Sequence, residues 1–195
     1  MNRLLNGVAH ALLFLSLPAA VVADQFVIKL DAPLTGEDTA LRETLGITEI
    51  ERFVSGEVSF VVLDAQSDAY VEAYLYAKGV SPIGISAVEF INSPQVGGAE
   101  PAAPVAADEM TTFVIERPIP GVGSFPLERK EGISRASIAA MEQLGGSVEW
   151  VHSYLTDIGT FCVYRATDAG QIEEHAVLAG APLGPITEVV PQVLD

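Results

Sequence analysis

The pattern of hydrophobic and polar positions in the second half of the chain predicts four strands and two helices. Short apolar runs bounded by glycine, proline and aspartate indicate strands at 112–117, 148–156, 160–166 and 186–193. Apolar residues at helical spacing indicate a helix at 127–144, and Asp168 is placed to cap a second helix that ends near 178. This β-α-β-β-α-β order is that of a ferredoxin-like domain.

The first half of the chain repeats this pattern with a shorter first helix, expected at 37–45. The segment 26–29 matches 113–116 at an offset of 87 residues, and 60–62 matches 161–163 at an offset of 101. The difference of 14 residues (101 − 87 = 14) indicates a longer segment around the first helix of the second half. We interpret the halves as two tandem ferredoxin-like (βαββαβ) domains of the α+β class, related by duplication and divergence.

Side-chain alternation along the two central strands of the second half separates two faces of the predicted sheet. The face expected under the helices carries Val151, Leu155, Phe161 and Val163, with the counterparts Ile50, Val54, Phe60 and Val62 in the first half. The other face carries Trp150, His152, Tyr154, Thr156, Cys162 and Tyr164. Because such an aromatic face needs a cover, we expect the two sheets to pack together as an intramolecular pseudo-dimer, a pseudo-dimeric α/β barrel.

Two further segments complete the predicted organisation. Residues 1–23 combine Arg3, an apolar run and small residues up to Ala23, as in a cleaved signal peptide. An uncleaved membrane anchor is the alternative, although the run is short for a membrane span. Residues 92–108 are rich in proline, alanine and glycine and are expected to form an exposed linker between the domains 24–91 and 109–195. We therefore expect a secreted or periplasmic protein.

The acidic composition narrows the classes of partner. The formal net charge is −16, so nucleic acid and anionic membrane surfaces would repel the protein, and a cation or a basic partner is favoured. No stretch beyond the signal peptide has membrane-spanning length, so no membrane contact is expected after cleavage. The single cysteine, Cys162, leaves an exported chain without an internal disulfide. The turn at 121–123 lacks the complete phosphate-binding pattern, so no nucleotide cofactor is expected.

Three segments of the second half carry a family resemblance. They are FVIERPIPGVG at 113–123, VEWVHSYLTDIGTFCVYRATD at 148–168 and IEEHAVLAGAPLGPITEVV at 172–190. Together they resemble the DUF4242 family, which includes a nickel-binding bacterial protein with a ferredoxin-like fold. The resemblance implies a site for nickel or a similar divalent ion. The first half has Glu51, Val61 and Tyr74 where the second has His152, Cys162 and His175, so we interpret it as a structural partner without the site.

The candidate site residues all lie in the second half. The candidate metal ligands are His152, His175, Glu116 and Cys162, and the candidate pocket residues are Tyr154, Trp150 and Tyr164. Imidazole is a good ligand for nickel, zinc or copper, but the spacing forms no compact metal-binding motif. His152 lies on a predicted strand and His175 on a predicted helix, so the sequence leaves open whether they share a site. The alternative is that these residues have ordinary structural roles, as hydrogen-bonded histidines, a buried cysteine and aromatic residues of an interface.

The sequence favours a binding protein over an enzyme. The first hypothesis is an exported protein that binds a divalent metal such as nickel, or a small molecule, through the second domain. The alternative is a cofactor-free enzyme, an isomerase or a monooxygenase, that uses Tyr154, His152 and Cys162 on a small organic substrate. A third hypothesis is a structural or inhibitory partner of another exported protein.

Overall fold

The computed structural model describes residues 24–34, 38–100 and 110–194, and the predicted signal peptide lies outside them. The first half contains β1 (Asp24–Leu30), α1 (Thr39–Leu45), β2 (Thr48–Val54), β3 (Ser59–Ala65), α2 (Asp68–Ala77) and β4 (Pro82–Ala87). A connecting region contains β5 (Phe90–Asn92) and the short 3-10 helix η1 (Pro94–Gly97). The second half contains β6 (Thr111–Arg117), the 3-10 helix η3 (Val122–Ser124), α3 (Leu127–Gln143), β7 (Val148–Leu155), β8 (Thr160–Ala166), α4 (Ala169–Ala179) and β9 (Ile186–Pro191).

The elements predicted for the second half all form, and local signals explain where α4 begins and ends. The Asp168 side chain accepts a hydrogen bond from the Gln171 backbone N–H, and Gly180 ends the helix in the left-handed conformation that glycine adopts without strain. As expected, α1 is short, with 7 residues against 17 in α3. No helix in the described ranges combines the length and apolar character needed to cross a membrane.

The strands form one nine-stranded sheet in the order β4-β1-β3-β2-β9-β6-β8-β7-β5. The order is β4-β1-β3-β2 in the first half and β9-β6-β8-β7 in the second, so corresponding strands follow the same order in both halves. Every pairing between these strands is antiparallel. The predicted α+β class is confirmed.

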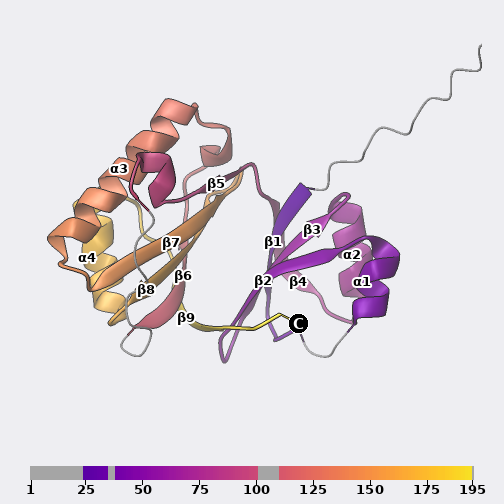
Figure 1. Ribbon diagram of the computed structural model, residues 1–195. Coiled ribbons are helices and arrows are strands. Elements are labelled where there is room, and N and C mark those ends of the chain that lie inside the picture. Colours follow the sequence, from indigo (N-terminus) through magenta and orange to yellow (C-terminus); the bar gives the residue numbers. More distant parts are fainter. Residues whose placement is uncertain (1–23, 35–37, 101–109, 195) are drawn as a thin grey trace, which may run out of the picture.

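Two links join the halves into a closed ring of strands. On one side, β2 pairs with β9. On the other, Val88 N–H donates to the Gln25 carbonyl of β1, while the next residue, Glu89, donates to the Leu155 carbonyl of β7. The chain thus passes from the edge of one half to the edge of the other. Figure 1 shows the strands in the middle of the molecule, with α1 and α2 on one side and α3 and α4 on the other.

Three hydrophobic clusters follow from this arrangement. Two lie between the helices and the strands of their own half, and the third lies between the two sets of strands. This inter-sheet core consists of Val27, Phe53, Phe60, Val62, Val114, Tyr154, Phe161, Val163 and Val189. The rings of Phe60 and Phe161 meet edge to face across it, with 6.3 Å between their centroids. The two sheets therefore bury apolar side chains against each other.

The predicted assignment of faces is wrong for β8, and equally for β3, whose Phe60 and Val62 lie in the inter-sheet core. Phe161 and Val163, expected under the helices, lie in the inter-sheet core, whereas Cys162 and Tyr164 lie under α3 and α4. Alternation shows which side chains share a face. Because both faces of this sheet are covered, the polarity of the side chains does not show which face meets the helices.

A bulge in β7 also changes the expected pattern. The register with β8 shifts between Trp150 and His152, so Trp150 lies under the helices while His152 lies on the inter-sheet side, where it contacts Glu51. The first half has the same irregularity in β2, between Glu49 and Glu51. An additional residue in one strand moves the following side chains to the opposite face, and strict alternation fails there.

The beginning of the predicted linker differs from the exposed segment that was expected. Asn92 is buried, and its side-chain oxygen accepts a hydrogen bond from Ser134 of α3 at 2.7 Å. The following helix η1 packs against α3 so closely that a Cβ added to Gly97 would lie 2.8 Å from Ser134 and Ile138. Residues 101–108 of the predicted linker lie outside the described residues, and the domain boundaries stay predictions.

Candidate functional site

A cavity of about 620 Å³ lies between the sheet of the second half and the helices α3 and α4. From the sheet it is lined by Trp150, Ser153, Leu155, Thr160, Cys162 and Tyr164, and from the helices by Arg129, Gly132, Ile133, Ala136, Ser137, His175 and Ala179. Arg117, Phe125 and several proline and glycine residues of the adjoining loops complete the wall. Its volume lies in the range of about 300–1,000 Å³ that is typical of ligand pockets.

The sequence of α3 explains why space remains there. The five lining residues of this helix stand at helical spacing, so they share one face. Gly132, Ala136 and Ser137 have small side chains, which leave a gap between the helix and the sheet where larger ones would close it. A Cβ added at Gly132 would meet no atom within 4 Å.

The polar side chains of the cavity form a chain of hydrogen bonds that ends at His175. Ser137 Oγ lies 3.0 Å from the Tyr164 hydroxyl and 3.1 Å from His175 Nε2. The same Nε2 lies 3.2 Å from the Ser137 carbonyl oxygen. Because a carbonyl only accepts, Nε2 carries the hydrogen and Nδ1 presents a lone pair. Nδ1 is buried and has no partner among the described residues.

Burial keeps the hydrogen-bonded side chains of Tyr164 and His175 uncharged at neutral pH. His175 is 1% exposed, and burial lowers the pKa of His175 to about 4. The charge of Arg117 lowers it further, whereas the backbone hydrogen bond to Ser137 opposes the shift. Burial, together with the neighbouring Cys162, raises the pKa of the Tyr164 hydroxyl, which therefore stays protonated.

Arg117 is the buried arginine of the cavity wall. It ends β6, is 5% exposed, and its Nη1 donates to the Pro182 carbonyl oxygen at 2.8 Å. Its Nη2 is buried and has no hydrogen-bond partner among the described residues. A second arginine of the wall, Arg129, lies over the ring of Phe125, 3.5 Å from its centroid.

Two glycines allow loops to pack directly on the end of β6. A Cβ added to Gly159 would lie 2.2 Å from the Arg117 carbonyl oxygen. One added to Gly184 would lie 2.3 Å from the Glu116 carbonyl oxygen. Only a residue without a side chain fits at such distances from a backbone. These contacts hold the backbone of Arg117 between the β7–β8 turn and the segment before β9.

The structure divides the predicted site residues between two faces of the sheet. Trp150, Cys162, Tyr164 and His175 all line the cavity. Glu116, His152 and Tyr154 instead contact residues of the first half on the inter-sheet side. The sequence left a shared site open, and in the structure the candidate residues form two separate groups.

On the inter-sheet side, His152 and Tyr154 meet at Glu51 of the first half. Glu51 Oε2 lies 3.0 Å from His152 Nε2 and accepts a hydrogen bond from the Tyr154 hydroxyl at 2.8 Å. Burial opposes the charge of Glu51, but the hydrogen bond and charge of His152, with the bond from Tyr154, lower the pKa of Glu51 overall. Glu116 pairs elsewhere, with Lys29, at 2.6 Å between Oε1 and Nζ.

The predicted metal ligands do not come together. His152 lies on the inter-sheet side and His175 on the helix side, so the sheet separates the two imidazoles. Cys162 is buried under the helices, where its Sγ lies 3.0 Å from Thr160 Oγ1. Within the described ranges, no three histidine, cysteine, aspartate or glutamate side chains form a group that could hold a metal ion.

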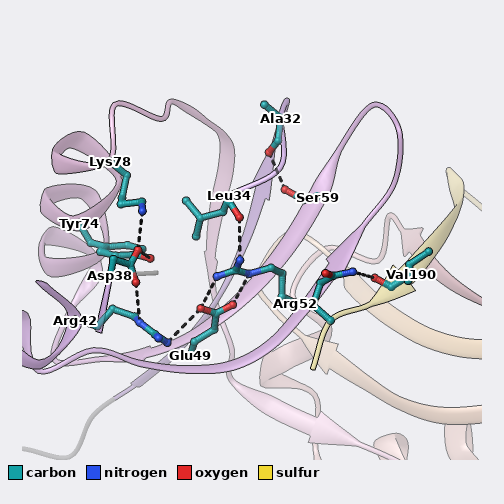
Figure 2. Close-up of polar contacts among 11 residues, drawn as sticks. Ala32, Leu34, Asp38, Arg42, Glu49, Arg52, Ser59, Tyr74, Lys78 and Val190 are labelled. Carbon is teal, nitrogen blue, oxygen red and sulfur yellow. Dashed lines mark hydrogen bonds and ion pairs between the residues drawn. The ribbon is translucent and has the colours of Figure 1, made fainter. Parts of the chain in front are cut away.

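The first half has an ion-pair network at the corresponding positions. The offset of 101 relates Glu49, Arg52 and Tyr74 to Trp150, Ser153 and His175 of the cavity. Figure 2 shows Glu49 between two arginines, with Asp38 beside Tyr74. Glu49 accepts from Arg52 Nε and Nη2 at 2.5 and 2.7 Å and from Arg42 at 3.2 Å. Asp38 pairs with Arg42 and Lys78, and burial with this carboxylate raises the pKa of Tyr74.

Arg117 and Ser137 are among the cavity residues that sequence reasoning missed. The available signal for Arg117 was its charge at the end of an apolar strand. The first half has Leu30 at this position, at the offset of 87. Ser137 carried no signal, because a serine in the middle of a helix is unremarkable until its neighbours across the fold are known.

In comparisons with known proteins, one family model matches a segment of the second half. A family model described as "Nickel responsive protein SCO4226-like" matches residues 113–189, which supports the resemblance to a family with a nickel-binding member, and the DUF4242 assignment stays a prediction. No curated protein matches the chain.

Two solved structures illustrate the wider similarity of the chain. A variant of chlorite dismutase from Candidatus Nitrospira defluvii is 10% identical, with a TM-score of 0.49, over 89% of this chain and 92% of that one. A putative monooxygenase from Lactobacillus acidophilus is 7% identical, with a TM-score of 0.40, over 87% of this chain and 94% of that one. Similarity at this level says nothing about the activity of this chain. The family match to residues 113–189 is therefore the finding that bears on function, and it covers the half that contains the cavity.

Proposed function

We propose that this protein binds a small organic molecule in the cavity of its second half, and that its first half serves as scaffold. One observation carries the proposal: the layer between helices and sheet holds an open cavity in the second half and paired ionic side chains in the first. Buried ion pairs are a weak source of stability but occupy space, whereas an open apolar cavity lacks packing contacts. An open cavity kept at the expense of those contacts fits a role in binding.

The same arrangement supports the proposal that the chain is a fused pseudo-dimer of two ferredoxin-like domains. Residues at equivalent positions meet across the interface, as they do around a two-fold axis. Glu51 contacts His152 and Phe60 contacts Phe161, both at the offset of 101. Lys29 contacts Glu116 at the offset of 87. An exported location, proposed from residues 1–23, would give the protein access to ligands outside the cytoplasm.

Binding is favoured over catalysis by the chemistry of the cavity. A general base works best when its pKa lies near the working pH. Burial holds the pKa of His175 at about 4, so its ring is a weak base at neutral pH. Cys162 is buried beside Thr160, a setting that suits packing better than nucleophilic attack. Enzymatic use of the cavity is therefore the weaker alternative.

A neutral fluorescent probe tests the proposed function. We expect N-phenylnaphthylamine, whose emission rises in apolar surroundings, to bind the purified protein at one saturable site. The variant Gly132→Leu should abolish this binding, because Gly132 lies in the middle of the lining face of α3 and a leucine there fills open space. The same change should stabilise the protein by about 0.5–1 kcal/mol, since glycine is a poor helix former. Unchanged probe binding by Gly132→Leu, or no saturable binding by the parent protein, would contradict the proposal.

A second candidate function is binding of nickel or a similar divalent ion at His152. The family model that matches residues 113–189 is described as nickel responsive, and this range includes His152 and Tyr154. Imidazole and carboxylate are suitable ligands, and Glu51 Oε2 lies 3.0 Å from His152 Nε2. The described residues offer two ligands there, fewer than a closed protein site has, so water would complete the coordination.

Calorimetric titration with nickel tests this candidate. We expect one weak saturable site in the parent protein, lost in His152→Ala because the imidazole ligand is gone. His175→Tyr is the matched control, since it changes the other histidine, on the opposite face, to the residue found at position 74. Equal loss of nickel binding in both variants would point to general destabilisation, and no saturable heat in the parent protein would exclude the site.

A further inference from the structure

We infer that the ligand of the cavity is an organic acid, whose carboxylate pairs with Arg117 and whose apolar body fills the remaining space. This inference rests on the proposed binding function and adds the chemical class of the ligand. Three observations carry it: a buried cation without a counter-ion, the absence of carboxylates among the described wall residues, and the residue that replaces Arg117 in the first half.

The guanidinium of Arg117 is buried without a counter-ion. Its side chain is one of the wall residues of the cavity, where Nη1 donates to the neutral Pro182 carbonyl and the guanidinium also interacts with the neutral Tyr164 hydroxyl. Nη2 is buried and unpartnered, and no described carboxylate lies within ion-pair distance. Arg52 of the first half, by contrast, is held by the carboxylate of Glu49. A buried charge is costly unless it is paired, so a ligand carboxylate would supply the missing partner.

The wall of the cavity has a charge opposite to that of the protein. The described residues that line it include Arg117 and Arg129 but no aspartate or glutamate, although the chain as a whole carries −16. A recess with positive charge and low-dielectric walls attracts anions. The rest of the wall includes Trp150, Phe125 and Leu155, which suit an aromatic or aliphatic body.

The first half, which contains the ion-pair network, has leucine at the position of Arg117. The offset of 87 places Leu30 at the position of Arg117, and Leu30 is fully buried in the hydrophobic core beside α1 and α2. The half with the ion-pair network thus has leucine, and the half with the cavity has arginine. The fold accepts an apolar residue at the end of this strand, which makes Arg117→Leu a variant with a precedent in the same chain.

Matched acid and amide ligands test the inference. We expect the purified protein to bind naphthylacetate about ten- to a hundred-fold more tightly than naphthylacetamide, because a hydrogen bond to a charged group contributes that much when the group is buried. In Arg117→Leu the acid should lose this advantage, while the neutral amide and N-phenylnaphthylamine still bind.

The possible outcomes separate this inference from the proposed function. Equal affinity of the parent protein for acid and amide would overturn the inference and leave the binding function in place. Failure of all three molecules to bind the parent protein would instead reject the binding function itself. An undiminished preference for the acid in Arg117→Leu would also overturn the role of Arg117. Should that variant not fold, the comparison of acid with amide in the parent protein still decides, and Arg117→Gln, which keeps polar contacts without the charge, replaces it.

Discussion

Replacing Glu49 with alanine is expected to lower the free energy of unfolding by about 3–5 kcal/mol, the cost of leaving buried charges without their partner. The Glu49 side chain is 1% exposed and accepts hydrogen bonds from both Arg42 and Arg52 (Figure 2). Burial opposes the charge of Arg52, yet its contacts with Glu49 raise the pKa of Arg52 overall. Without Glu49, Arg52 would lose its carboxylate partner, and Arg42 would keep only Asp38.

Urea unfolding followed by circular dichroism measures this effect, since the midpoint shifts in proportion to the stability lost. Glu149→Ala is the matched control, because it removes one carboxylate from a more exposed pair, Glu149 with Arg165 at 2.8 Å. Exposed pairs contribute about 0–1 kcal/mol, so the control should lose little. A similar small loss of stability for both variants would show that water solvates the Glu49 network. The proposed contrast between a first half stabilised by ion pairs and a second half with a cavity would then weaken.

Replacing Phe161 with alanine is expected to cost about 3–5 kcal/mol and to destabilise both halves together, as for other large-to-small changes in a core. Phe161 lies in the inter-sheet core, and its ring meets that of Phe60 edge to face. The core is shared by the two sheets and the strands close into a ring, so neither half should unfold alone. We expect a single cooperative transition in the parent protein and in the variant.

Two probes distinguish this outcome from independent unfolding. Trp150, the single tryptophan, reports by fluorescence on the second half, and hydrogen exchange of β1 and β3 reports on the first. Val151→Ala is the control, because Val151 is 38% exposed at the bulge. In a double-mutant cycle, Phe60→Ala and Phe161→Ala should couple by about 0.5–1.5 kcal/mol, as contacting aromatic rings do. Two separate transitions, with only the tryptophan signal moving in Phe161→Ala, would mean that the halves are independent.

These results would bear directly on how the two halves divide their roles. A first half that is stabilised by its own ion-pair network can present a fixed surface to the second half. The second half then keeps the space between α3, α4 and its sheet open, with its stability supplied in part by the shared inter-sheet core. Stability and binding would thus depend on different layers of one molecule.

The sequence by itself determined the elements of the fold. The strands and helices of the second half stand where the apolar patterns predict them, and the ends of α4 follow from Asp168 and Gly180. The α+β class followed from their order. These features depend on residues close together in the chain, because capping and hydrophobic periodicity act within a few positions of each other.

Only the tertiary structure decided which side chains meet. The sequence indicated His152 and His175 as candidate ligands and left open whether they share a site, whereas the structure places them on opposite faces of a sheet. The cavity depends on Arg117, Ser137 and His175, which belong to a strand and two different helices. A periodic pattern gives the spacing of side chains but not the face that a distant element covers, since that choice is made by burial across the whole ring of strands.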